Sequence, residues 1–122
     1  MLATLYPIAA ELIHPEHDDL VVTHRTQTRF EAEAWQTVIG DENGDGIQRV
    51  IFKIFDEQDN SVFVHPEYLT PYGAFGDKIK CNPMSKELWG SLESGNYRLE
   101  VRAEGMNGTW SKLYEQPFMI QK

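Results

Sequence analysis

The stretch Leu92-Glu-Ser-Gly95-Asn-Tyr97-Arg-Leu99-Glu-Val101-Arg-Ala103 decides the fold class of this chain. From Tyr97 onward, apolar residues alternate with Arg and Glu, and this period of two predicts a strand with one buried and one solvated face. A Leu, a Gly and then a Tyr at the start of such a strand are typical of the tyrosine corner of Greek-key sandwiches, where the phenol bonds back to the backbone. The alternative is a buried aromatic residue that simply opens a strand. Both interpretations indicate an all-β fold.

The same alternation recurs along the chain. We expect strands near residues 28–35, 48–55, 61–64, 96–103 and 113–120, with weaker candidates at 9–13 and 20–23. The turn residues at 56–60 predict that the second and third strands pair as a hairpin. Only 85–92 has helical spacing, for one or two turns. Short strands separated by turn clusters predict two packed sheets. The shared core is expected to contain Phe30, Phe52, Ile54, Tyr97, Leu99 and Val101.

Length and charge narrow the functional classes. The 122 residues are enough for one hydrophobic core, so we expect a single domain over 1–122 with 1–8 as an N-terminal extension. The formal net charge of -8, without a basic stripe, argues against nucleic-acid binding. No apolar run approaches the roughly 20 residues that span a bilayer, so we expect no membrane insertion. The first residues lack the pattern of a signal peptide, although Met1 is equally compatible with a domain cut from a longer secreted protein. We expect a monomer.

The segment 65–92 is long for a connection in such a fold and rich in aromatic residues. Tyr68, Tyr72, Phe75 and Trp89 are our candidate ligand-binding residues, because exposed aromatic rings on a rigid scaffold stack on sugars or anchor a protein partner. The alternative is that they cover the core where a long loop crosses a sheet. Solvent exposure distinguishes the two.

The loop after the first strong strand resembles the opening of a calcium loop. Asp41, Asn43 and Asp45 are candidate Ca²⁺ ligands, because oxygen ligands at alternate positions followed by Gly46 suit a hard cation. The twelfth position is Phe52, however, so the closing Glu of an EF-hand is missing. We favour the alternative, a turn between two strands, and expect no cofactor.

No catalytic constellation is apparent in the sequence. His14, His17, His24 and His65 do not have the spacing of a metal-ligand motif. The only cysteine, Cys81, is expected to be an exposed thiol in a loop, without a neighbouring base and without a disulfide partner.

Several strings together resemble bacterial immunoglobulin-like domains, which are repeated in secreted and cell-surface proteins. They are Phe30-Glu-Ala-Glu-Ala-Trp35, Asn43-Gly-Asp-Gly-Ile47, Val50-Ile-Phe52-Lys-Ile54, Pro71-Tyr72-Gly-Ala-Phe75-Gly76, Cys81-Asn82 and Gly95-Asn-Tyr97. Similar domains often carry a cysteine at the position of Gly73, paired with a later one, so the resemblance implies that Cys81 is the remnant of a lost pair.

The resemblance implies an all-β, immunoglobulin-like two-sheet Greek-key sandwich with a long aromatic-rich loop between strands. It also implies a non-catalytic role as a spacer, adhesion or protein-binding domain of a bacterial surface or secreted protein. A carbohydrate-binding module that uses the aromatic residues of 65–92 is the alternative. In either case the partner would be a protein or a glycan, and the chain would bind it outside the cell.

Overall fold

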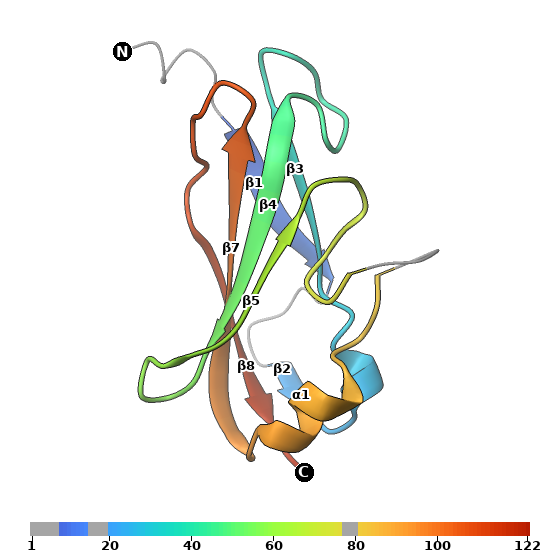
Figure 1. Cartoon of the computed structure of the whole chain (residues 1–122), viewed down its shortest axis with the longest axis vertical. Helices are drawn as coiled ribbons and strands as arrows, with labels where there is room; N and C mark the ends of the chain where they lie inside the picture. Colours follow the sequence, from blue (N-terminus) through green and yellow to red (C-terminus); the bar gives the residue numbers. More distant parts are fainter. Residues whose placement is uncertain (1–7, 15–19, 77–80) are drawn as a thin grey trace.

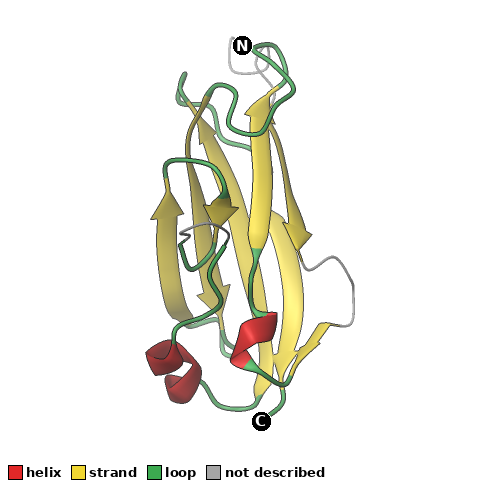
Figure 2. Cartoon of the chain, turned by 90° about the vertical axis from the view of Figure 1, so that its right-hand side faces the viewer, coloured by secondary structure: helices red, strands yellow, loops and turns green. Residues whose placement is uncertain are grey.

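The computed structural model describes residues 8–14, 20–76 and 81–122, which form two sheets packed face to face (Figures 1 and 2). The smaller sheet has the order β1-β3-β6, with β1 at Ile8–His14, β3 at Glu31–Gln36 and β6 at Tyr72–Gly73. The larger has the order β2-β8-β7-β4-β5. Its strands are β2 (Leu20–Val22), β4 (Ile47–Phe55), β5 (Ser61–Glu67), β7 (Gly95–Gly105) and β8 (Tyr114–Ile120). The predicted all-β, two-sheet sandwich is confirmed.

The two longest strands, β4 and β7, form the centre of the larger sheet. They pair antiparallel, and Phe52 lies opposite Val101 on the face turned toward the core. The predicted hairpin between β4 and β5 is also present, with Phe52 opposite His65. Among the strand pairs of the described residues, only β2 and β8 run parallel. Because β1 begins and β8 ends at opposite ends of the long axis, the chain traverses the full length of the sandwich (Figure 1).

Strand β5 is an edge of the larger sheet, and its proline faces the open side. The backbone N–H and C=O of Ala103 both bond to Ser111, on the side of β7 away from β4. In an antiparallel sheet, the N–H and C=O groups of successive residues point to opposite sides of the strand. Val50 lies opposite Ala103, so its backbone groups point away from β7 and toward Glu67 of β5. Pro66, the neighbour of Glu67, therefore directs its nitrogen away from β4. A proline here removes no bond from the sheet and leaves a gap in the donor row of its edge.

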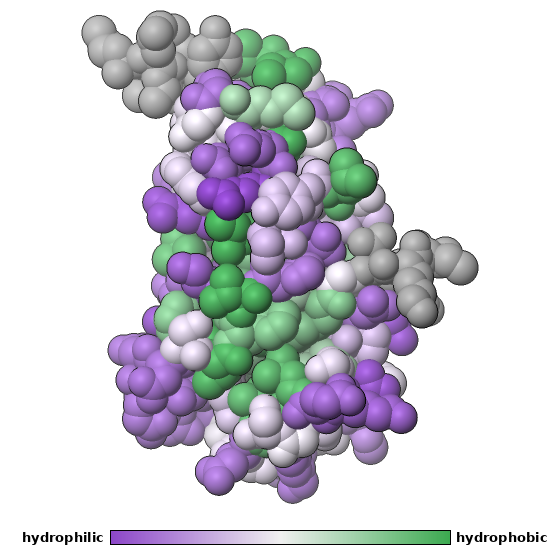
Figure 3. All heavy atoms as spheres, in the orientation of Figure 1, coloured by the Kyte–Doolittle hydropathy of each residue, from purple (hydrophilic) through white to green (hydrophobic). Residues whose placement is uncertain are grey.

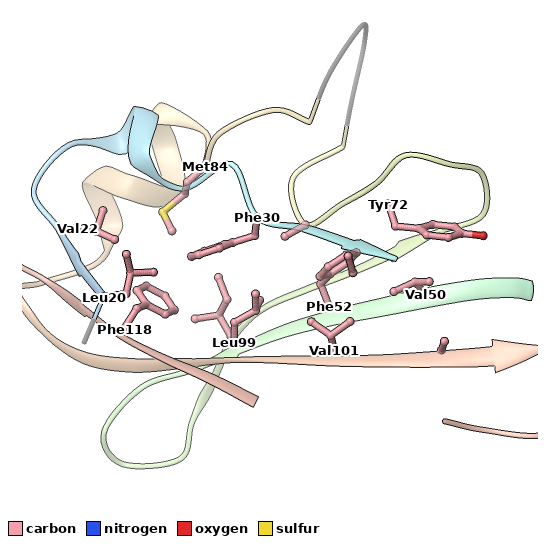
Figure 4. Packing of buried hydrophobic residues seen from close by; sticks show 14 of the residues in the cluster. Leu20, Val22, Phe30, Val50, Phe52, Tyr72, Met84, Leu99, Val101 and Phe118 are labelled. Atoms are coloured by element: carbon pink, nitrogen blue, oxygen red, sulfur yellow. The ribbon is translucent and has the colours of Figure 1, made fainter. Parts of the chain in front are cut away.

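The core lies between the sheets and is closed by segments outside them. Figure 4 shows Phe30, Phe52, Leu99 and Phe118 converging there, with Met84 covering one end. Of the six predicted core residues, five are fully buried, whereas Tyr97 is half-buried at the margin of the cluster. Its phenol donates to the carbonyl oxygen of Glu93 at 2.7 Å, which confirms the predicted tyrosine corner.

The helical segments gather at the end of the sandwich where the chain finishes (Figure 2). The helix α1, Lys86–Ser91, falls inside the predicted 85–92 and is capped by Ser85, whose hydroxyl accepts from the N–H of Leu88. A 3₁₀ helix, Arg25–Gln27, precedes the smaller sheet.

Two expectations need correction. Strand β3 begins at Glu31 rather than at 28, because the hydroxyl of the buried Thr28 bonds to backbone groups on two other segments. The thiol of Cys81 is buried, with the residue only 3% exposed, because it packs over Gly73 of β6.

Candidate functional site

The structure separates the four aromatic residues that the sequence grouped as ligand-binding. Tyr72 is 1% exposed and belongs to the core, so it presents no ring face to a ligand. Phe75 is half-buried against Phe30 and Phe63. Trp89 lies on α1, under the ammonium group of Lys122, and Tyr68 alone is exposed. The four therefore form no common platform.

Two of the three candidate calcium ligands already accept hydrogen bonds from backbone N–H groups of the turn. The side-chain oxygen Oδ1 of Asn43 accepts from the N–H of Ala34 at 2.9 Å, and Oδ2 of Asp45 accepts from the N–H of Glu42 at 3.0 Å. Asp41 is exposed. No group of three His, Cys, Asp or Glu side chains suited to a metal is formed by the described side chains, those of residues 8–10, 20–76 and 81–122. The oxygens thus act as turn acceptors in this structure.

The outer face of the larger sheet carries a surface that we call the tryptophan face. It consists of Arg49, Ile51, Tyr68, Arg102, Trp110 and Leu113. Two guanidinium groups lie over the Trp110 ring, with Cζ atoms 5.4 Å (Arg49) and 5.5 Å (Arg102) from its centroid. A groove of about 180 Å³ runs beside it, with Ile51 and Leu113 among its lining residues.

An ion pair between β4 and β7 and a backbone hydrogen bond hold the two arginines of this face. Arg49 Nε donates to Glu104 Oε1 at 2.7 Å, and this bond raises the pKa of Arg49, with a smaller contribution from Tyr68. Arg102 Nε donates to the carbonyl oxygen of Ser111 at 3.4 Å. Lys53 and Glu100 lie opposite each other across the strands and line the groove. Both guanidinium groups beside Trp110 therefore have a partner that restricts their orientation.

A second concavity opens between the two sheets, at the side where β5 is the edge. We call it the inter-sheet cleft; it has a volume of about 420 Å³ and is lined by Arg25, Phe63, His65, Phe75, Asn82, Pro83 and Ser85. In the view of Figure 3, apolar side chains gather over β4 and β5 in the middle of the molecule, bordered by hydrophilic ones. Most of the lining comes from the segment 65–92 that the sequence singled out.

Sequence reasoning missed most residues of both surfaces. Trp110 and Leu113 follow the turn 105–108 and carry no motif. Arg102 could have been predicted, because it lies on the solvated face of the predicted strand 96–103. A residue there contacts its cross-strand neighbours, which for Arg102 include Ile51 of β4. Arg25 gave no signal, because its place depends on a contact 59 residues away in the sequence.

Within the described ranges, no helix is long and apolar enough to cross a membrane. The sequence matches no protein-family model and no curated protein. The solved structures that are similar in fold include that of the fibronectin(III)-like modules of CbhA from Clostridium thermocellum, with a TM-score of 0.56 and 17% sequence identity. The match covers 95% of this chain and 47% of that chain. This chain therefore has the fold of a fibronectin(III)-like, immunoglobulin-type β-sandwich.

Proposed function

We propose that this chain is a non-catalytic β-sandwich module that binds another protein through its tryptophan face. The observation that carries the proposal is Trp110, which contacts the guanidinium groups of Arg49 and Arg102 beside a groove and has 37% of its surface exposed. Trp, Tyr and Arg are the residues most enriched at the energetic centres of protein interfaces.

The arrangement of the face supports a protein ligand. It combines exposed apolar and aromatic side chains, with Leu113 46% exposed and Tyr68 56% exposed, with the charged Lys53 and Glu100 that line the same groove. Aromatic residues and arginine beside polar groups are typical of protein interfaces. Restricted side chains also help, because the ion-paired Arg49 loses less conformational freedom when a partner arrives.

A non-catalytic role is compatible with the fold. Immunoglobulin-type sandwiches host many functions, and the fold alone assigns none of them. A spacer or adhesion domain within a longer bacterial surface or secreted polypeptide is the setting in which we place the module. In that setting a fixed face on a rigid sandwich joins it to a neighbouring domain or to a separate partner.

Site-resolved crosslinking tests this function. A photoreactive phenylalanine analogue replaces Leu113 on the face, or Val38 in the β3–β4 loop as a control of similar exposure, and the producing cells are irradiated. We expect a discrete protein adduct from position 113 and none from position 38.

Competition with purified chain tests whether the tryptophan face is the surface that the partner binds. An excess of purified chain should abolish the adduct, whereas the Trp110→Ala variant, with its fold verified by circular dichroism and thermal melting, should compete at least about tenfold less well. Equal adducts from both positions, or equal competition by both chains, would refute the proposal.

A further inference from the structure

The inter-sheet cleft contains a guanidinium group that forms no ion pair with any carboxylate of the described residues. The chain has 19 Asp and Glu against 11 Lys and Arg, and Arg49 and Arg98 both form ion pairs. Arg25 is half-buried and lines the cleft, yet no Asp or Glu of the described ranges lies within ion-pair distance of it. An arginine in such a position is complementary to an anionic ligand.

Arg25 is held in place by contacts to a segment remote in the sequence. Its Nη1 donates to the carbonyl oxygen of Met84 at 2.9 Å. The hydroxyl of Thr28 donates to the carbonyl oxygen of Arg25 at 2.6 Å and accepts from the N–H of Met84 at 2.7 Å. The guanidinium has five N–H donors, so this single bond leaves donors for a ligand in a fixed orientation.

The remaining lining residues combine aromatic rings with polar groups. Phe63 and Phe75 lie 5.0 Å apart at a tilt of 46°, and His65 stacks on Phe63. The Ser85 hydroxyl accepts from α1, which leaves its proton to donate, and the Asn82 amide lies 3.5 Å from the Phe75 carbonyl oxygen. Aromatic rings suit the C–H face of a sugar, and the polar groups suit its hydroxyls.

We propose that the inter-sheet cleft binds a carboxylate-bearing saccharide, with the carboxylate on Arg25 and the sugar ring against Phe63 and Phe75. This site is separate from the tryptophan face and does not depend on the function proposed for it. The volume of about 420 Å³ is within the range of small-ligand sites. The carboxylate of Glu67, 3.5 Å from His65 Nε2, is not among the lining residues.

The neighbouring sheet edge favours a saccharide over an acidic peptide. A peptide entering beside β5 would gain most from pairing with its open edge. Pro66 lies in that edge with its nitrogen outward and offers no donor, so an added strand would lose a bond at the middle of the cleft. A sugar needs no such pairing.

The test is a titration of the whole chain with trigalacturonate, followed by amide chemical shifts in NMR. Its methyl ester keeps the shape of the probe and removes the charge. We expect binding of the acid, with shifts concentrated at Phe63, His65 and Phe75, and at least about tenfold weaker binding of the ester. Arg25→Gln should weaken acid binding by about the same factor.

A matched control separates recognition from folding. Arg29 is also half-buried and also donates through Nη1 to a carbonyl oxygen, that of Cys81 at 2.9 Å, but it does not line the cleft. Arg29→Gln should bind trigalacturonate within about twofold of the unmodified chain. If Arg25→Gln fails to fold, the comparison of acid with ester still decides.

Four results would overturn the proposal. The first is no binding at about 10 mM trigalacturonate, on the order of the weakest affinities worth measuring, and the second is equal binding of the acid and its ester. The third is chemical-shift changes confined to the tryptophan face, and the fourth is equal or tighter binding of a triglutamate peptide. The last would replace the saccharide with an acidic protein segment.

Discussion

Replacing Thr28 with valine removes a hydroxyl that links the 3₁₀ helix to the segment before α1. Thr28 is fully buried, and its hydroxyl is both the acceptor for the N–H of Met84 and a donor to the carbonyl oxygen of Arg25. Valine has the same shape but leaves these two backbone groups without that partner. An unsatisfied buried donor costs about 1–3 kcal/mol. The carbonyl oxygen of Arg25 still accepts from the backbone N–H of residue 28, so the N–H of Met84 dominates, and we expect a loss of about 2 kcal/mol in the free energy of unfolding.

Urea unfolding followed by tryptophan fluorescence measures this loss. With a slope of about 1.5–2 kcal/mol/M, the unfolding midpoint should fall by roughly 1–2 M, and the melting temperature by about 10 °C. Thr28→Ser is the control, because it keeps the hydroxyl and loses only a buried methyl group, at about 1 kcal/mol. If the valine variant is as stable as the serine variant, the hydroxyl does not hold these segments together.

Four further outcomes are expected. Tyr97→Phe should lower the free energy of unfolding by about 1 kcal/mol through loss of the corner hydrogen bond, and an unchanged urea midpoint would contradict this. Burial raises the pKa of Tyr72 and of Tyr97. The stability that the neutral phenols contribute is therefore complete below the unfolded pKa of about 10 and is lost as the pH rises through the folded values. Urea midpoints measured from pH 8 upward should fall above about pH 10, and they should fall less in Tyr72→Phe. Pro66→Val restores a donor to the open edge of β5 and should promote self-association, visible in sedimentation velocity against the monomer expected of the unmodified chain. Millimolar Ca²⁺ should move the melting temperature by less than about 1 °C, because the oxygens of the 41–46 loop already accept backbone bonds; a Ca²⁺-specific shift abolished by Asp45→Ala would identify an ion site instead.

The strands could be predicted because their pattern is local. Alternation along 48–55 and 96–103 fixes which side chains face inward, and the observed register places Ile54 opposite Leu99 in the core. The strand β6 could not be predicted, since Tyr72–Gly73 is two residues long and is defined by pairing with β3. The same applies to the end of β5, where Pro66 argues against a strand unless its edge position is known.

The candidate surfaces were less predictable because they depend on contacts between distant segments. Composition predicts an aromatic-rich segment over 65–92, but it does not distinguish the buried Tyr72 from the exposed Tyr68. Trp110 belongs to the tryptophan face only because β4 and β7 bring Arg49 and Arg102 to its ring. Such convergence is a property of the tertiary fold.

The path of the chain from one end of the sandwich to the other determines how the module would respond to tension. A pull applied at Ile8 and at Ile120 acts along the axes of β1 and β8 (Figure 1). It would slide β1 past its antiparallel partner β3, and β8 past both β7 and the parallel β2, so that several backbone hydrogen bonds would have to break together. Strands loaded in this direction resist extension far better than a hairpin opened from its end, where the bonds fail one after another. The sandwich would therefore resist stretching along its long axis more than opening of a hairpin from its end.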